Sequence, residues 1–162
     1  MTITDPTSFE RSLEEAERAC FDALVTVLGL TAGKNAYIGL SDGNPDCMVF
    51  DIGYIQTGDM TAFKGTVFHF RASADFYSRN RQNLQRFLMR TVSVLPISPD
   101  HPDAQERLNG GNVVHFRIAP ETQAVSDITT TTVKMGKDGK ETPTFTATVS
   151  FDVVFVTGER EQ

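Results

Sequence analysis

The sequence contains no tryptophan and only two cysteines, Cys20 and Cys47. Two thiols do not make a disulfide framework or a zinc site of cysteines, so we expect a reduced, cytosolic setting. No apolar run approaches the ~20 residues that are needed to span a bilayer. Residues 1–12 are polar and carry acids early, which is unlike a signal peptide.

Basic residues are also scarce, with 15 Lys and Arg against 21 Asp and Glu and a formal net charge of −6. A dedicated nucleic-acid binder usually presents a basic surface, so this class is disfavoured. The chain has no phosphate-binding loop, no dinucleotide glycine fingerprint and no nucleophile elbow. The sequence therefore shows none of these active-site or cofactor motifs, and no cofactor is expected.

The turn SDGNPD at residues 41–46 superficially resembles a calcium loop, but it lacks the Asp-x-Asp spacing and the late Glu, which favours a solvated turn. Cys47 follows this turn, and we expect it to be more reactive than Cys20, although no adjacent base activates it. Cys20 lies on the apolar face of a predicted helix, where an inert core thiol is expected.

The chain has enough apolar residues to form the hydrophobic core of a single domain. The chain has 162 residues, of which 40% are hydrophobic and 12 are phenylalanine. This length and composition indicate one domain with a sizeable core. We place that domain at residues 1–158 and expect residues 159–162 to form a flexible tail.

Two segments show helical spacing. In residues 7–30, Thr7 and Glu10 resemble a capping box. The apolar face of this segment is formed by Phe9, Leu13, Ala16, Cys20, Leu24 and Val27. Residues 78–95 form the second predicted helix, which Pro96 ends. The polar loop at residues 97–112 follows, and a loop of this length is often functional.

Strand patterns fill the rest of the chain. Residues 144–155 place an apolar side chain at every second position, alternating with polar side chains except at Val154, which predicts a strand with one buried face. Shorter strands are expected at residues 37–40, 48–55, 62–72, 113–119 and 128–135. The order of elements predicts an α+β domain, with a mainly antiparallel sheet and two principal helices packed on one face.

The tripeptide His-Phe-Arg occurs twice, at residues 69–71 and 115–117. In both strands the phenylalanine alternates with the polar residues, so the histidine and arginine should point away from the core. Chance similarity between two half-buried strands is the favoured interpretation. The alternative is that His69 and His115 share one patch as bases or metal ligands. The neighbouring arginines oppose a cation, and His101 in the long loop is the only other histidine, so no metal site is expected.

Charges are segregated on the two predicted helices. An acidic stripe, Glu10, Glu14 and Glu17, lies on the first helix. A basic stripe, Arg79, Arg86 and Arg90, lies on the second. Three interpretations are open. The two stripes contact each other within one subunit, they contact each other between neighbouring subunits of a ring, or both are solvated faces without a partner stripe. A second candidate contact is the hairpin tip with Lys137, Asp138 and Lys140, which can project and pair with another chain's sheet edge.

The order of elements resembles the tail-terminator (tail-completion, minor tail) proteins of long-tailed bacteriophages. The matching segments are FERSLEEAERACFDALVTVLGL, MVFDIGYI, NLQRFLMRTVSVL and TFTATVSFDVVFV, and the loop at 97–112 is longer than the layout requires. The resemblance implies a structural protein and not an enzyme. Such proteins form a ring, usually a hexamer, on the end of the tail tube and stop tube growth.

The same resemblance implies the partners. They are the protein itself, the tail-tube protein and the head–tail connector or neck proteins, in the tail or neck of the virion after synthesis in the host cytoplasm. DNA passes through such a ring without specific binding, and no membrane is involved. Two other functions stay open. One is a ligand-binding domain or enzyme whose Phe-lined apolar pocket holds His69 or His115. The other is the tail-tube subunit itself.

Overall fold

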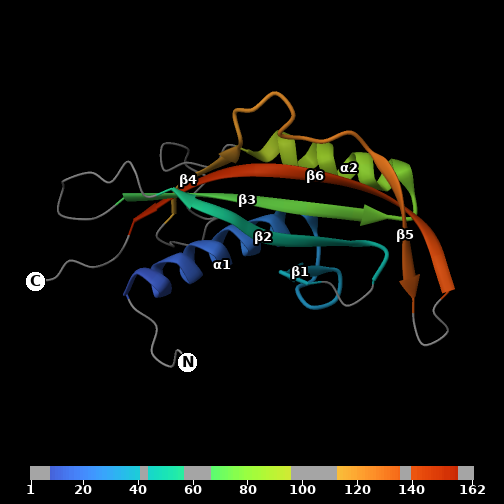
Figure 1. Cartoon of the computed structure of the whole chain (residues 1–162), viewed down its shortest axis with the longest axis horizontal. Helices are drawn as coiled ribbons and strands as arrows, with labels where there is room; N and C mark the ends of the chain where they lie inside the picture. Colours follow the sequence, from blue (N-terminus) through green and yellow to red (C-terminus); the bar gives the residue numbers. More distant parts are fainter. Residues whose placement is uncertain (1–7, 41–43, 57–66, 96–112, 136–139, 157–162) are drawn as a thin grey trace, which may run out of the picture.

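The computed structural model describes residues 8–40, 44–56, 67–95, 113–135 and 140–156. The elements follow in the order α1 (Ser8–Leu28), β1 (Ala36–Ile38), β2 (Cys47–Gln56), β3 (Val67–Ser78), α2 (Arg81–Val94), β4 (Val113–Ile118), β5 (Thr129–Met135) and β6 (Lys140–Val156). One sheet has the strand order β1-β2-β3-β6-β4, and β5 pairs with β6 beyond β4 (Figure 1). All pairs are antiparallel except β1 with β2. The predicted α+β class is confirmed.

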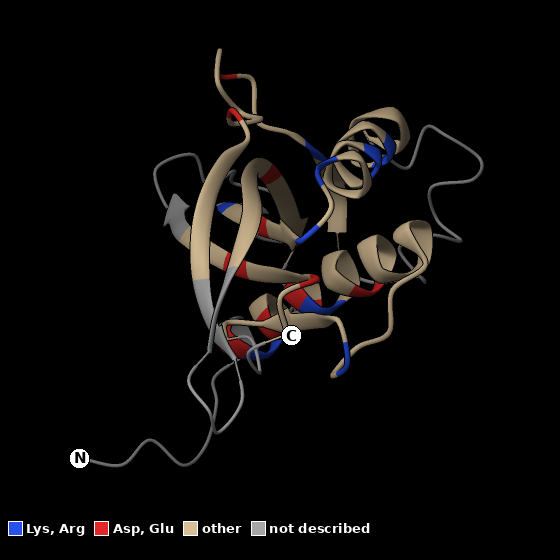
Figure 2. Ribbon diagram, turned by 90° about the vertical axis from the view of Figure 1, so that its right-hand side faces the viewer, with Lys and Arg blue, Asp and Glu red and all other residues tan. Residues whose placement is uncertain are grey.

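Both helices pack on the same face of the sheet (Figure 2). The predicted apolar spacing of α1 is confirmed at Ala16, Cys20 and Leu24, which are 0–1% exposed. The proposed capping residue Thr7 lies outside the described residues. In α2, Leu84 and Leu88 are buried and supply the contact with the sheet.

The central strand β6 carries the alternation that the sequence shows. Phe151, Val153 and Phe155 are fully buried beneath the helices. Phe151 packs against Phe50 of β2 and Phe116 of β4, with ring centroids 6.0 and 5.1 Å apart. Aromatic rings from three strands therefore form one continuous core beneath the helices.

The boundary between β3 and α2 differs from the prediction. The sequence interpretation ended the strand at residue 72 and began the helix at 78, whereas β3 continues to Ser78 and α2 begins at Arg81. Ala74 and Phe76 continue the buried face of β3, but a small alanine gives a weak alternation signal. The helix begins late because the side chain of Asn80 accepts hydrogen bonds from the backbone N–H groups of residues 82 and 83 and caps it.

The hairpin of β5 and β6 extends beyond the rest of the sheet. β3 pairs with β6 only from Phe145 onward, whereas β5 pairs with β6 from Lys140 to Thr146. In the described part of the chain, the first residues of β6 therefore pair on one side only, as a two-stranded ribbon (Figure 1). The predicted turn at 136–139, the loop at 97–112 and the tail at 159–162 lie outside the described residues.

Candidate functional site

The two His-Phe-Arg segments lie on the two strands that flank β6. Arg71 of β3 and Arg117 of β4 are both register partners of Asp152 in β6. His69 and His115 are both partners of Val154. The repeat therefore places four polar side chains around one aspartate on the helix-free face of the sheet. We call His69, Arg71, His115, Arg117 and Asp152 the Asp152 cluster.

The Asp152 carboxylate is buried and fully engaged. Its side chain is 3% exposed. Oδ2 accepts hydrogen bonds from Nε and Nη2 of Arg117 at 3.1 and 2.9 Å. Oδ1 contacts Nε2 of His69 and lies 3.4 Å from Nε of Arg71. Arg71 also pairs with Glu121, which follows β4. One carboxylate thus ties β6 to both neighbouring strands.

Two pKa values in the cluster are shifted. Burial alone would raise the pKa of Asp152, but the hydrogen bonds from Arg117 and His69 outweigh it and lower the pKa below its ordinary value. The pKa of His115 is lowered, first by burial and then by the charge of Arg117, which together outweigh the attraction of Asp152. At neutral pH, Asp152 is therefore charged and His115 neutral.

The cluster is built to hold strands together rather than to bind a metal. Within the part of the chain that the structure describes, no group of three His, Cys, Asp or Glu side chains could hold a metal ion. Two arginines lie beside the histidines and repel a cation, as expected from the sequence. The Asp152 oxygens already have cationic partners, so they are not open acceptors for a ligand.

The geometry does not favour an apolar pocket that contains His69 or His115. Phe70 and Phe116 are completely buried beneath the helices, and the adjacent histidines point to the opposite face because strand side chains alternate. The predicted orientation of the two repeats is thus confirmed. The phenylalanine side chains fill the core instead of lining a cavity with the histidines.

The charge stripes on the helices stay apart. Arg79 pairs with Asp46 at 2.6 Å, whereas Arg86 and Arg90 are exposed. Among the described residues, no ion pair joins Glu14 or Glu17 to Arg86 or Arg90. The interpretation in which the stripes meet within one subunit is therefore wrong for these four residues.

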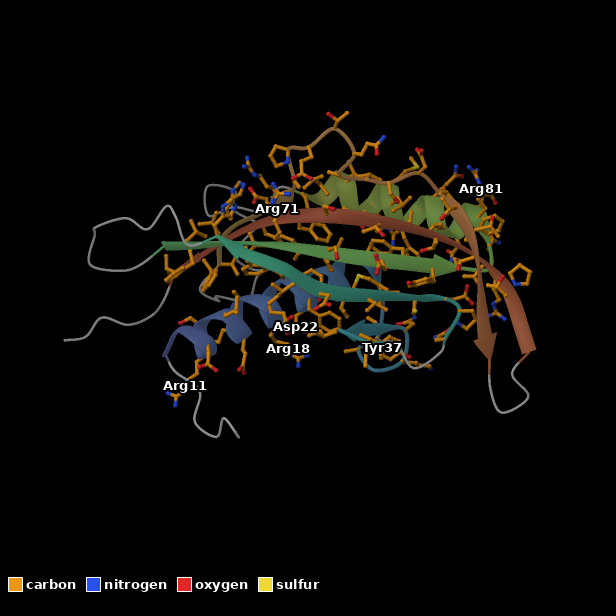
Figure 3. All side chains as sticks on the ribbon, in the orientation of Figure 1. Arg11, Arg18, Asp22, Tyr37, Arg71 and Arg81 are labelled. Atoms are coloured by element: carbon orange, nitrogen blue, oxygen red, sulfur yellow. The ribbon has the colours of Figure 1, made fainter. Side chains whose placement is uncertain are left out.

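The acidic flank of α1 lies toward β2. Phe21, which follows Glu17 by one turn, packs against Phe50 of β2 with centroids 6.5 Å apart. The pKa of Glu17 is raised by burial, then by the charge of Asp51 on β2 and by Glu14, against the lowering effect of Arg18. The lower edge of the molecule in Figure 3 carries Arg18, while α2 with Arg81 lies along the upper edge.

Other predicted contact residues have different outcomes. Glu10 is half-buried in the first turn of α1. Lys137 and Asp138 lie outside the described residues. Lys140 begins β6 opposite Met135, and its side chain is not described. The sequence therefore predicted the ribbon itself, and the contacts of its tip remain a prediction.

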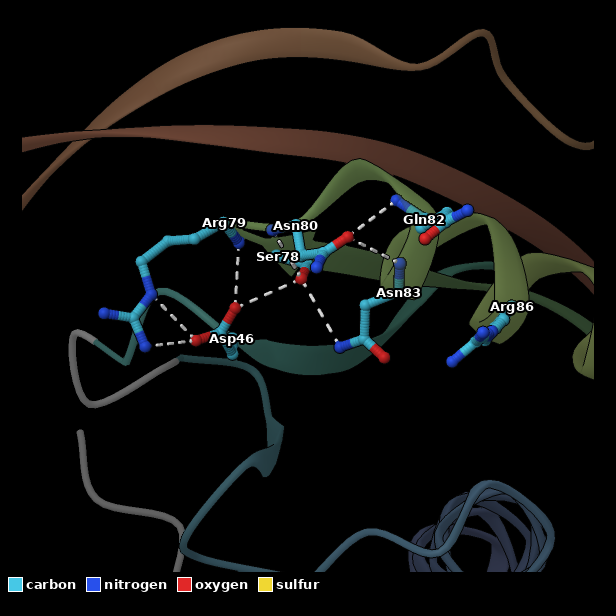
Figure 4. A pocket seen from close by; sticks show the side chains of 7 residues that line it. All are labelled: Asp46, Ser78, Arg79, Asn80, Gln82, Asn83 and Arg86. Carbon is cyan, nitrogen blue, oxygen red and sulfur yellow. Dashed lines mark hydrogen bonds and ion pairs between the residues drawn. The ribbon is translucent and has the colours of Figure 1, made fainter.

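A polar hollow of about 430 Å³ lies at the start of α2 (Figure 4). Its walls are formed by Asp46, Ser78, Arg79, Asn80, Gln82, Asn83 and Arg86. Asp46 accepts hydrogen bonds from Ser78 and from Arg79, and Asn80 caps the helix. These side chains use their hydrogen-bonding groups on one another. The arrangement therefore stabilises the junction between β3 and α2 and leaves few groups for a ligand.

Cys47 is buried, which its position beside a turn did not indicate. This thiol is 2% exposed, and burial together with the charge of Asp46 raises its pKa to about 11. It is therefore an unreactive thiol at neutral pH, because the thiolate is the nucleophile. Cys20 is the core thiol that the sequence predicts, and burial raises its pKa well above the ordinary value.

Two features of the structure were not found from the sequence. Asp152 occupies a polar position of a regular alternation, and its only signal is a charge between Phe151 and Val153 in a strand that is otherwise free of charge from residue 144 onward. On α2, Met89 and Val92 are 71% and 45% exposed, although both are hydrophobic. A helical wheel places Met89 on the side of α2 away from the buried Leu84 and Leu88. This position is the sequence signal that could have revealed its exposure.

None of the described helices is long and apolar enough to cross a membrane. The sequence matches no family model and no curated protein.

Proposed function

We propose that the protein is a ring-forming structural subunit of the tail-terminator kind, which closes the end of a phage tail tube and provides the joint to the head or neck. The observation that carries the proposal is the separation of charge between the two helices. α2 has three arginines and no acidic residue, and the acidic flank of α1 faces away toward β2. Surfaces that differ and complement each other are what a head-to-tail ring requires.

The element order agrees with this proposal. The described chain runs from a helix through three strands to a second helix and three further strands, which is the layout of the proteins it resembles. Such layouts host many functions, so the charged surfaces of α1 and α2 support the proposal more than the fold does. The projecting β5–β6 ribbon adds a sheet edge that can pair with the tube protein or with a neck protein.

The chemistry of the described residues gives less support to a ligand-binding enzyme. The histidines of the Asp152 cluster are on the polar face of the sheet, and their carboxylate is engaged by Arg117 and His69. The larger described hollow is polar, and the Asp46 carboxylate in its wall is already bonded to Ser78 and Arg79. An assembly role uses the exposed charges and leaves these groups in a structural role.

The test is the assembly state of the purified protein, measured by native mass spectrometry and negative-stain imaging of one sample. We expect closed rings of a single size, which bind to the ends of purified tail tubes and stop their elongation. Long open tubes would instead identify the tube subunit. A monomer that neither forms rings nor binds tube ends would refute the proposal.

A further inference from the structure

The outward side of α2 combines exposed apolar and basic side chains. Met89 and Val92 are 71% and 45% exposed, and Arg86 and Arg90 lie beside them on solvent-facing positions. Methionine and arginine are enriched at the centres of protein interfaces, where glutamate and lysine are depleted. We call these four residues the α2 knob.

A hollow of about 190 Å³ lies between α1 and the β1 region. Phe21, Tyr37, Ile38 and Leu40 contribute to its walls, together with Arg18. Its volume is about six times the ~30 Å³ that one water molecule occupies in the liquid, which leaves room for a methionine side chain. Leu40 is 84% exposed at this site, so the hollow has apolar surface that nothing in the described chain covers.

Acidic residues stand beside this hollow. Glu14 is one turn before Arg18 on α1, and Glu17 is one turn before Phe21, so both lie next to hollow-lining residues. Burial raises the pKa of Glu17. The negative charges of Asp51 and Glu14 also raise it, against the lowering effect of Arg18. Around the hollow, Glu14, Glu17 and Asp22 outnumber Arg18 and Lys34, so an approaching arginine meets more negative than positive charge.

The two surfaces lie on different sides of the molecule. α2 is the upper helix and α1 the lower one in the two perpendicular views of Figures 1 and 2. Arg18 and Tyr37, which line the hollow, lie along the lower edge in Figure 3, away from Arg81 at the start of α2. One copy can therefore use its knob on a second copy while its own hollow receives a third.

We infer that the α2 knob of one copy docks into the α1–β1 hollow of the next copy, with Met89 in the hollow and Arg86 and Arg90 against Glu14 and Glu17. The inference rests on the proposed ring assembly and names its interface. A second copy is the occupant because one chain carries both halves, which are complementary in charge. The contact joins unlike patches, so its repetition makes a closed ring when the rotation closes.

Disulfide trapping tests the contact directly. Met89→Cys and Leu40→Cys variants are purified separately, mixed and oxidised, and the products are resolved on a non-reducing gel. The natural cysteines are buried and stay silent. We expect disulfide-linked dimers in the mixture and few with either variant alone, because identical positions do not meet in a head-to-tail contact. A mixture of Met89→Cys with Thr122→Cys, which is on an exposed segment, is the control and should not cross-link.

Charge variants test the second half of the contact. Arg86→Gln with Arg90→Gln should raise the concentration at which rings form by on the order of tenfold or more. Thr122→Glu with Gln123→Glu produces the same change in net charge at exposed residues elsewhere and should leave assembly unchanged. Rings that form normally in the arginine variant, with no cross-link in the mixture, would overturn the interface and leave the ring proposal standing. A wild-type protein that stays monomeric at every concentration and does not bind tube ends would overturn both.

Discussion

Arg117 on β4 binds Asp152 on β6 side-on, through Nε at 3.1 Å and Nη2 at 2.9 Å. This pair is half of a bridge across three strands, because His69 and Arg71 reach the same carboxylate from β3 on the other side. β3 and β4 are separated in sequence by α2, so the bridge joins parts of the chain that only the fold brings together. It also fixes register, since a one-residue slip of either strand would turn its arginine toward the core.

We therefore expect Asp152→Asn to destabilise the fold. The neutral amide of asparagine has no negative charge to balance the cations on either side. The guanidinium groups of Arg71 and Arg117 would then lie close together without a carboxylate between them. Arg117 is 45% exposed and can turn to water, so we expect a loss of about 1–3 kcal/mol in the free energy of unfolding. Urea titration followed by circular dichroism measures it.

The matched control is Asp127→Asn, which makes the same chemical change at an exposed aspartate. It should alter the free energy of unfolding by less than about 0.5 kcal/mol. Equal effects at the two positions would show that the strand bridge contributes nothing specific to stability. The difference between wild type and Asp152→Asn should also shrink in acid. The folded pKa of Asp152 is lowered, so its contribution is present above the ordinary pKa of an aspartate, about 4, and is lost as the pH falls through the folded pKa.

A second pH dependence comes from His115. Burial and Arg117 lower its folded pKa below the ordinary value of 6.5. The unfolded chain then binds a proton more readily than the folded one, so stability is greatest above pH 6.5 and decreases as the pH falls toward the folded pKa. His115→Gln removes the titrating group and should make the plot of urea midpoint against pH flatter between about pH 6.5 and 5. An unchanged slope would show that His115 is not its source.

How much of this fold was readable from the sequence depended on the strength of each local pattern. The twelve-residue alternation in β6 and the spacing of Ala16, Cys20 and Leu24 in α1 involve large or regularly placed apolar residues, and both were predicted correctly. The end of β3 was not, because Ala74 carries little hydrophobic signal and its strand partners, on β2 and β6, are distant in sequence. Strand propensity depends on those neighbours as much as on the segment itself.

The Asp152 cluster shows the same limit at the level of a site. Period-two alternation predicted that His69 and His115 point away from the core, but not that β3 and β4 lie on either side of β6. That order places the two arginines at one level, and only the topology supplies it. The sequence interpretation favoured chance for the repeat because it had no register with which to compare the strands.

Thiol labelling tests the burial of Cys47. The pKa of about 11 and the 2% exposure predict negligible reaction of the folded protein with a thiol reagent at pH 7.5. Both cysteines should react fully in 6–8 M urea, roughly the range that unfolds small domains. Thr122→Cys provides the positive control, because position 122 is exposed and should react at once under native conditions. Rapid native labelling of the wild-type protein, mapped to Cys47 by mass spectrometry, would contradict the buried position at the start of β2.

The start of α2 offers a test of the junction between strand and helix. Asn80 satisfies two backbone N–H groups at 2.9 and 3.2 Å, and no acidic residue in the first turn shares the task. Asn80→Ala should lower the free energy of unfolding by about 1 kcal/mol, whereas Asn80→Ser keeps a capping oxygen and should lower it by less than half of that. Urea denaturation of the three proteins side by side measures the difference. If alanine and serine were equally destabilising, the lost stability would come from another contact of Asn80, and the late start of α2 would need a cause other than its cap.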